Sequence, residues 1–318
     1  MPYQHIPVML GEAMEWLAPS AGQILVDATL GGAGYTRVMS KAVGRSGKIY
    51  SFDLDQLAQA NAETLIKAEK LYNVQLIKNN FGTLAESLTG FGLPQVQAID
   101  GIVFDLGLSS AHLADSKRGF AFATDGPLDM SFGDLGRNDK TTNQLVNEAT
   151  EAELAKIIRQ FGEEPRGGQV ARVIVKARQL APITTTGQLV DIIAGAFSPK
   201  ERHKIGRHFA TRAFQALRIA TNQELAVLEQ ALLAAVPLLK PNGRIVVVSY
   251  HSLEDRIVKQ FFREQSLDCI CPPELPICSC THRATLRTLT KKPILPTLVE
   301  IERNPRSRSA KLRAAQKI

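Results

Sequence analysis

The sequence predicts a doubly wound α/β fold that carries a small inserted helical domain. In the first third of the chain, four short and almost wholly apolar runs alternate with stretches of helical periodicity. Such runs are typical of parallel strands that helices cover on both faces. The next run of this quality begins about 140 residues later, whereas a crossover between parallel strands needs only a dozen or so. We therefore expect a second domain between the fourth and fifth strands.

The expected strands end at polar or turn-forming residues. They cover residues 23–30, 47–55, 74–81, 98–110 and 243–250. Helical periodicity lies around "TRVMSKA" and in residues 55–71, where Asp55 is expected to cap the helix. This alternation of strand and helix indicates a sheet with helices on both sides.

The inserted domain is predicted to span residues 113–210, so that residues 1–112 and 211–318 form one discontinuous sheet domain. Thr150 and Glu153 form a capping box before an apolar stripe with helical spacing, and two further helices follow. Thr221 and Glu224 are expected to cap a helix that runs to Pro237 and belongs to the sheet again. We expect the insert to recognise the substrate.

Bulk composition indicates a folded chain without a membrane segment. Its 318 residues are 44% hydrophobic, which is enough for a sizeable core. No run of about 18 apolar residues occurs, and the N-terminus lacks a basic region followed by an apolar block. The expected location is the cytoplasm.

Positive charge is concentrated near the C-terminus. The chain has a net charge of +7, but from residue 283 onward ten Lys and Arg stand against two acids. This strip predicts a polyanionic partner. The alternative is a solvated, charged tail.

All four cysteines fall in "CICPPELPICSC". Because a cytosolic chain does not normally keep disulfides, Cys269, Cys271, Cys278 and Cys280 are either free thiols or zinc ligands. Structural zinc sites usually space their ligands as Cys-x(2–4)-Cys, and Cys-x-Cys is tighter. We expect no metal and leave zinc open.

Candidate ligand-binding residues follow the strands, where an open parallel sheet binds ligands. In "DATLGGAGY", Asp27 ends the first strand, and the glycines that follow let the backbone approach a ligand closely. The pattern differs from the Gly-x-Gly-x-x-Gly fingerprint of dinucleotide binding. A glycine-rich turn without a ligand is the alternative.

Three further positions extend this candidate site. Asp53, after the second strand, is placed to accept both hydroxyls of a ribose. Phe81 could flank an adenine or belong to the core. Asp105 ends the fourth strand, before Ser109 and His112, and a buried carboxylate is costly without a partner.

This constellation predicts a cofactor-binding sheet but does not by itself separate S-adenosylmethionine from NAD. The missing dinucleotide fingerprint and the acids Asp27, Asp53 and Asp105 favour a sulfonium cofactor, because no pyrophosphate then needs a helix N-terminus. An NAD-dependent oxidoreductase remains an alternative.

Five long motifs resemble those of one family. "DLGLSSAHLADSKRGFAFATDGPLDM", "GEEPRGGQVARVIVKAR", "RHFATRAFQALRI", "VVSYHSLEDRIVKQFF" and "NPRSRSAKLR" occur in family order along nearly the whole chain. They are similar to those of the RsmH (MraW) family. The resemblance implies a Rossmann-like methyltransferase sheet and S-adenosylmethionine-dependent methylation of a cytidine N4 in the decoding region of bacterial 16S ribosomal RNA.

The resemblance also implies individual roles. With Gly32 from the glycine turn, the expected cofactor contacts are Ala33, Gly34, Tyr35, Asp53, Phe81, Asp105 and His112. The sequence departs from the family at Tyr35, where many members have His, and at Ser131, where Arg is usual. The second departure puts in doubt any RNA contact by that side chain.

The substrate-facing residues are a hypothesis from position along the strands. We expect Asp105, Ser109, Tyr250, His251 and Ser252 to enclose a flipped cytidine, and Ser252 with Asp255 to start the helix after the fifth strand. Expected RNA contacts are Arg172, Lys176, His208, Arg212, Arg306, Arg308, Lys311 and Arg313. The expected partner is 16S rRNA or the small ribosomal subunit, a homodimer is left open, and the non-enzymatic alternative is an RNA-binding assembly factor.

Overall fold

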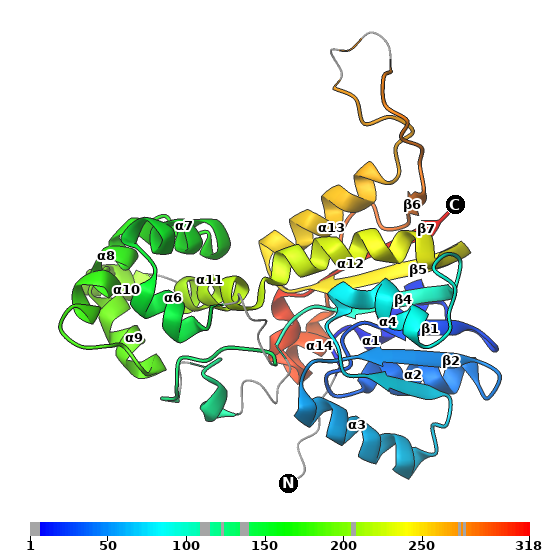
Figure 1. Cartoon of the computed structure of the whole chain (residues 1–318), viewed down its shortest axis with the longest axis horizontal. Coiled ribbons are helices and arrows are strands. Elements are labelled where there is room, and N and C mark those ends of the chain that lie inside the picture. Colours follow the sequence, from blue (N-terminus) through cyan, green and yellow to red (C-terminus); the bar gives the residue numbers. More distant parts are fainter. Residues whose placement is uncertain are drawn as a thin grey trace. The chain divides into compact units, whose positions relative to one another are not determined.

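Contacts within the chain divide it into two compact units. The computed structural model describes residues 7–108, 115–121, 124–133, 140–204, 208–272, 275 and 278–318. The sheet unit comprises Met1–Gly107 and Leu225–Ile318, and the helical unit comprises Leu108–Glu224. Figure 1 shows the elements of both units.

The sheet unit contains a seven-stranded mixed sheet in the order β3-β2-β1-β4-β5-β7-β6. Neighbours among the first five of these strands pair in parallel, whereas β7 is antiparallel to both β5 and β6. The strands are β1 (Ile24–Asp27), β2 (Lys48–Phe52), β3 (Val74–Ile77), β4 (Ile99–Asp105), β5 (Leu239–Ser249), β6 (Leu286–Thr288) and β7 (Lys311–Lys317).

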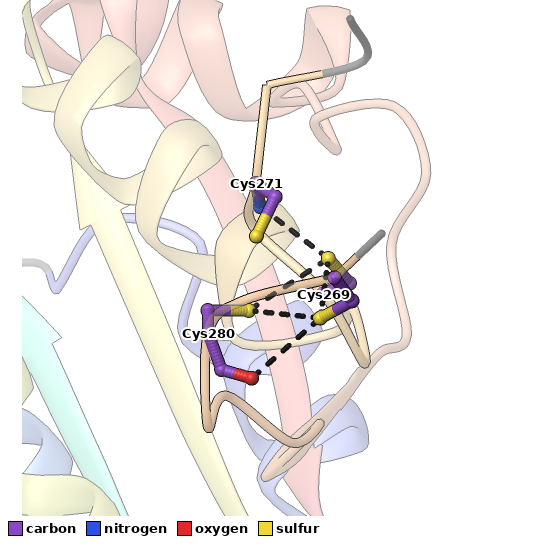
Figure 2. A group of neighbouring side chains, drawn as sticks. Cys269, Cys271 and Cys280 are labelled. Carbon is purple, nitrogen blue, oxygen red and sulfur yellow. Dashed lines mark hydrogen bonds between the residues drawn. The ribbon is translucent and has the colours of Figure 1, made fainter. Parts of the chain in front are cut away.

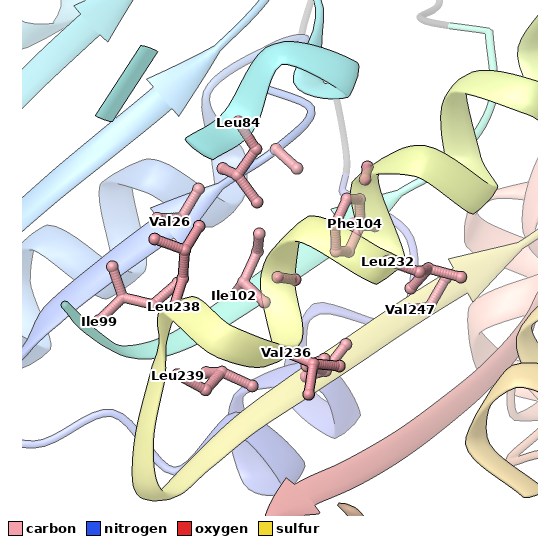
Figure 3. Close-up of a cluster of buried hydrophobic side chains, with 14 of the residues drawn as sticks. Val26, Leu84, Ile99, Ile102, Phe104, Leu232, Val236, Leu238, Leu239 and Val247 are labelled. Atoms are coloured by element: carbon pink, nitrogen blue, oxygen red, sulfur yellow. The ribbon is translucent and has the colours of Figure 1, made fainter. Parts of the chain in front are cut away.

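Helices cover both faces of this sheet. They are α1 (Leu10–Leu17), α2 (Gly34–Val43), α3 (Gln56–Glu69), α4 (Leu84–Gly90), α12 (Glu224–Leu238), α13 (Ser252–Glu264) and α14 (Leu298–Arg303). On one face, Ile102 and Phe104 of β4 pack with side chains of α4 and α12 (Figure 3). Val258 and Phe262 of α13 belong to the same cluster. On the other face, Val103 packs with side chains of α1 and α2. This alternation along β4 confirms the doubly wound α/β fold.

The helical unit has its own core. Its helices are α6 (Thr142–Glu148), α7 (Glu151–Gly162), α8 (Gly167–Arg178), α9 (Thr186–Ala194), α10 (Pro199–Lys204) and α11 (Thr211–Asn222). Leu154 and Ile158 of α7, Ile174 of α8 and Leu217 of α11 are fully buried in this core. Thr150 and Glu153 make the predicted capping box at the start of α7.

The limits of the two units differ from the predicted ones. We expected residues 211–318 to belong to the sheet, but α11 packs in the helical unit, where the Thr221 hydroxyl lies 2.6 Å from that of Thr142. Thr221 is therefore a buried residue of α11 and does not cap the next helix. The role of the unit in substrate recognition stays a prediction.

One interpretation of the basic strip near the C-terminus was a solvated, charged tail. For the last residues of the strip, this interpretation is wrong. The sequence "KLRAAQK" is strand β7, and Leu312 to Ala315 are buried in the sheet. Three cationic side chains and a glutamine in this short strand obscure the alternation of apolar and polar residues that would predict it. None of the described helices is both long and apolar enough to cross a membrane.

Candidate active site

The loop after β1 is built around a buried carboxylate. Asp27 is fully buried, its Oδ2 accepts hydrogen bonds from the backbone N–H and hydroxyl of Thr36 at 3.0 and 2.6 Å, and its Oδ1 accepts from the N–H of Thr29 at 3.2 Å. Burial raises the pKa of Asp27 to about 6, although the bonds from Thr36 and Thr29 oppose the rise. Asp27 therefore stabilises the loop between β1 and α2 through these hydrogen bonds. It does not line the mouth of the cofactor site, as the sequence suggested.

The glycine turn leads directly into α2 through left-handed backbone. Gly31 has φ +47° and Ala33, the residue before α2, has φ +60°. The N–H of Gly31 donates to Oδ2 of Asp53 at 2.9 Å. A Cβ on Gly34 would lie 2.0 Å from Cγ of Pro7, so this position requires glycine because of the N-terminal segment. Gly32 is exposed.

The side chain of Tyr35 is directed into the core. Its side chain is 3% exposed and its hydroxyl donates a hydrogen bond to the carbonyl of Val8. Burial raises the pKa of Tyr35 well above its ordinary value. The ring packs with α1 and α2 in the core, so any contact of Tyr35 with a ligand of the loop is through its backbone.

Asp53 joins the glycine turn to the end of β2. Besides the bond from Gly31, its Oδ1 accepts from the N–H of Asp55 at 2.8 Å. Asp55 caps α3 as predicted, because its side chain accepts from the N–H of Leu57. Two ordered backbone donors fix the Asp53 carboxylate at the carboxyl edge, where it is only partly buried.

Phe81 follows β3 in a short 3-10 helix, η1 (Phe81–Thr83). Its ring is partly buried and meets the ring of Phe104 edge to face, with 5.8 Å between centroids. Phe81 therefore packs against the core. Part of its surface remains accessible at the carboxyl edge of the sheet, where Asp53 also lies.

Asp105 and Tyr250 come together at the ends of the neighbouring strands β4 and β5. The hydroxyl of Tyr250 donates to Oδ1 of Asp105 at 2.6 Å, and the N–H of Asp105 donates to the hydroxyl of Thr29 at 2.7 Å. Burial raises the pKa of Asp105 to about 7, with the bond from Tyr250 opposing the rise. A carboxyl group near its midpoint at neutral pH can accept a proton or a hydrogen bond there.

The turn after β5 is fixed by Glu254. Its Oε2 accepts from the N–H groups of Tyr250 and His251 at 2.8 and 3.2 Å, and its own N–H donates to Nδ1 of His251 at 3.4 Å. The predicted helix start at Ser252 and Asp255 is therefore wrong by one residue, since His251 and Glu254 make the capping box. Histidine is not among the residues that usually cap helices, so the sequence pattern favoured the neighbouring serine.

His251 also carries an unsatisfied group. Its side chain is about 10% exposed and Nε2 lies 3.1 Å from Oε1 of Glu254. Within the described part of the chain, that nitrogen nevertheless makes no hydrogen bond. Ser252 is exposed at the first turn of α13. Ser109 and His112 lie outside the described residues.

The predicted RNA contacts fall into separate groups. On α8, Arg172 and Lys176 are exposed one turn apart, and Arg172 lies 3.5 Å from Glu151. His208 is exposed, whereas Arg212 is partly buried beside Glu164. Arg306 and Arg308 are exposed in a 3-10 helix, η3 (Pro305–Ser309).

Arg313 and Lys311 form ion pairs within the sheet unit. Nε of Arg313 lies 2.7 Å from Oδ1 of Asp255, and Nζ of Lys311 lies 3.2 Å from Oδ2. Arg313 is only 6% exposed. These ion pairs link α13 to β7. Because Arg313 is buried in such a pair, we do not propose it as an RNA contact.

These features define a class of protein. A glycine turn at the carboxyl edge, an anchored carboxylate after β2 and a second after β4 fit a nucleoside cofactor that carries positive charge. Partly buried acids at this edge would repel the pyrophosphate of a dinucleotide. The fold and site are those of a cofactor-dependent α/β enzyme.

Comparison with known proteins shows which enzyme family this is. The model of the MraW methylase family matches residues 2–318, and the chain belongs to that family. The predicted resemblance is confirmed, and with it the dependence on S-adenosylmethionine.

Similar curated proteins match along nearly their whole length. Proteins named ribosomal RNA small subunit methyltransferase H from Thermomicrobium roseum and Heliobacterium modesticaldum are 48% and 43% identical to this chain. The matches cover 99% and 100% of this chain and 94% and 100% of those proteins. An rRNA methylase from Streptococcus thermophilus has a TM-score of 0.43 at 11% identity, covering 100% of this chain and 99% of that one.

Proposed function

We propose that this methylase transfers a methyl group from S-adenosylmethionine to N4 of a cytidine in the decoding region of 16S ribosomal RNA, in the bacterial cytoplasm. The name shared by the relatives supports a small-subunit RNA substrate. The observation that carries the chemistry is the Tyr250–Asp105 pair at the ends of β4 and β5.

The residues that would hold the cofactor belong to three loops. The turn from Gly31 to Gly34 would let the backbone approach it, Asp53 would accept hydrogen bonds from its ribose hydroxyls, and the accessible part of the Phe81 ring would flank its base. When bound, S-adenosylmethionine supplies an electrophilic methyl group. Most of the acceleration then comes from holding the acceptor amine in line with that group.

Asp105 provides what a cytosine amine needs. The lone pair of this amine is delocalised into the ring, which makes it a poor nucleophile. A carboxylate that accepts a hydrogen bond from one amine N–H favours the reactive geometry, and a pKa of about 7 leaves Asp105 substantially ionised at neutral pH. Tyr250 positions the carboxylate through its hydroxyl.

His251 and Ser252 complete the proposed surface for the cytidine. Both stand at the start of α13, directly after Tyr250. The test is His251→Ala, measured separately for cofactor affinity and turnover. Unchanged turnover would remove His251 from the site.

The cofactor part of the proposal is tested by binding. Asp53→Ala removes the acceptor of the Gly31 and Asp55 N–H groups, and we expect S-adenosylmethionine affinity, measured by calorimetry, to fall about 100-fold. Asp55→Asn is the matched control, because asparagine also caps helices. Equal affinities for both variants, or tighter binding of NADH than of S-adenosylmethionine, would contradict the assignment.

The substrate part is tested by methyl transfer. The purified protein is mixed with labelled S-adenosylmethionine and either 16S rRNA, 23S rRNA or small subunits. We expect label in 16S rRNA only. Cofactor binding without transfer to any of these RNAs would favour the non-catalytic assembly factor.

A further inference from the structure

The four cysteines lie in a long loop between α13 and β6, away from the strand ends that form the active site (Figure 1). Hydrogen bonds close the loop at its base. The N–H groups of Thr285 and Leu286 donate to the carbonyl of Gln265 at 2.8 and 3.0 Å, and the hydroxyl of Thr285 donates to Oε1 of Gln265. The base of the loop is therefore ordered by ordinary backbone pairing.

Beyond this base, the residues of the loop that the structure describes form no apolar core. Among the described residues between Phe262 and Leu286, none is buried. Its apolar side chains Leu267, Ile270 and Leu275 are 42%, 52% and 49% exposed. A segment that buries so little apolar surface cannot offset the entropy of ordering its backbone. Some other interaction is needed to hold its tip together.

The cysteine sulfurs supply a candidate for that interaction. Cys269 Sγ lies 3.3 Å from Cys278 Sγ and 3.7 Å from Cys280 Sγ, and the last two are 3.6 Å apart. With Cys271 included, all four sulfurs lie within 4.8 Å of one another. Figure 2 shows the labelled cysteines converging from two separate stretches of chain.

These distances match one metal ion. Zinc–sulfur bonds of about 2.3 Å in a tetrahedron place the four sulfurs about 3.8 Å apart. We propose that Cys269, Cys271, Cys278 and Cys280 bind one Zn²⁺ ion in a closed structural site that orders the tip of this loop. The proposal concerns only the loop, so it is independent of the proposed methyl transfer.

The short Cys-x-Cys spacing is compatible with such a site. The sulfurs of Cys278 and Cys280 already lie 3.6 Å apart in this loop, and neither cysteine pair is in a helix. The N–H of Cys271 donates to Sγ of Cys269 at 3.4 Å, which is the kind of bond that stabilises a thiolate. Each Cys-x-Cys pair can therefore present two sulfurs to one ion.

The metal content of the full-length protein tests the site. Purified under reducing conditions from zinc-supplemented medium, the protein should contain about one zinc ion per chain. The double variant Cys278→Ser with Cys280→Ser should contain almost none. Ser279→Ala, the matched control between these two cysteines, should keep its zinc. Cobalt-substituted protein should show the charge-transfer bands of tetrahedral thiolate ligation.

Proteolysis measures what the ion does. Removal of zinc by a chelator should raise chymotryptic cleavage within residues 265–285 about tenfold, while affinity for S-adenosylmethionine stays unchanged. Zinc bound with no change in cleavage would contradict the structural role.

Other outcomes would overturn the site itself. These are zinc retained by the double variant, bound iron in place of zinc, and four reduced thiols without metal. An intact mass lowered by two hydrogens for each disulfide, again without metal, would also contradict it.

Discussion

The hydroxyl of Tyr250 donates a 2.6 Å hydrogen bond to Oδ1 of Asp105. Asp105 is the last residue of β4 and pairs with Val248 of β5, and Tyr250 directly follows β5. Gly107 allows the approach, because a Cβ there would lie 2.8 Å from Cδ2 of the Tyr250 ring. The bond fixes the carboxyl that we propose as the acceptor for the substrate amine.

Tyr250→Phe should raise the pKa of Asp105. The hydroxyl favours the ionised carboxylate, so its loss should move the pKa upward by about one unit. Carbon-detected NMR of labelled aspartate measures this directly. The acid limb of the pH–rate profile should move in the same direction.

Tyr72→Phe is the matched control for this experiment, because Tyr72 is 79% exposed. It should leave both the titration and the pH profile unchanged. A pKa that stays at its wild-type value in Tyr250→Phe would mean that the hydroxyl does not act on Asp105.

Asp105→Asn should gain stability relative to wild type as pH rises. The pKa of Asp105 is about 7 in the folded protein against 3.8 ordinarily, so between these values the unfolded chain loses the proton while the folded chain keeps it. The stabilising effect of the protonated form is complete below about pH 4 and is lost as pH rises through 7.

Asparagine has no such proton, so the difference in unfolding free energy between the variant and wild type should grow by roughly 3–4 kcal/mol between pH 4 and 8. Asp27, whose pKa is also raised, is present in both proteins and cancels. Denaturant titrations at several pH values measure this difference. A difference that does not vary with pH would show that the carboxyl is not perturbed by folding.

Gly34→Ala should destabilise the protein by about 1–3 kcal/mol, because the new methyl group would overlap the ring of Pro7. Gly11→Ala, in α1, is the control, since no atom lies within 4 Å of its new Cβ. That change should stabilise by about 0.5–1 kcal/mol through helix propensity. Thermal melting distinguishes the two, and similar melting temperatures would argue against the packing of Pro7 on the loop.

Neutralising Arg306 and Arg308 to Gln should weaken RNA binding without changing thermal stability. We expect affinity to fall for all RNA sequences and the salt dependence to flatten, by about 0.7–0.9 in log–log slope for each lost phosphate contact. Filter binding at several salt concentrations measures this. An unchanged slope would place the RNA on another surface.

Arg313→Gln should lower thermal stability without weakening RNA binding. Its guanidinium pairs with Asp255 inside the sheet unit, and removing one partner of a buried ion pair costs about 3–5 kcal/mol. The melting temperature should fall while the salt slope of RNA binding stays near that of wild type. A reduced slope with normal stability would restore Arg313 as an RNA contact.

Comparison of these residues shows how far the sequence could predict the structure. The five parallel strands follow from apolar runs, and the cap at Asp55 from local side-chain chemistry. Strand β7 could not be predicted in this way, because the cations that obscure its pattern, Lys311 and Arg313, find their acidic partner Asp255 56 and 58 residues away.

The sequence predicted which residues lie at the candidate site, but it did not predict the hydrogen bonds between them. Strand ends identified Asp53, Asp105 and Tyr250, whereas the hydrogen bond between the last two joins residues 145 positions apart. Tyr35 shows the converse, since a residue in the glycine turn directs its ring into the core. The convergence of the cysteines likewise depends on the path of the loop.

The nucleoside that receives the methyl group shows which reaction the protein catalyses. Small-subunit RNA that lacks the modification is incubated with the protein and labelled S-adenosylmethionine, digested to nucleosides, and analysed by mass spectrometry. We expect label in N4-methylcytidine from the decoding region, and loss of that label with Asp105→Ala. Label in 5-methylcytidine, in another nucleoside or in another region of the RNA would contradict this expectation.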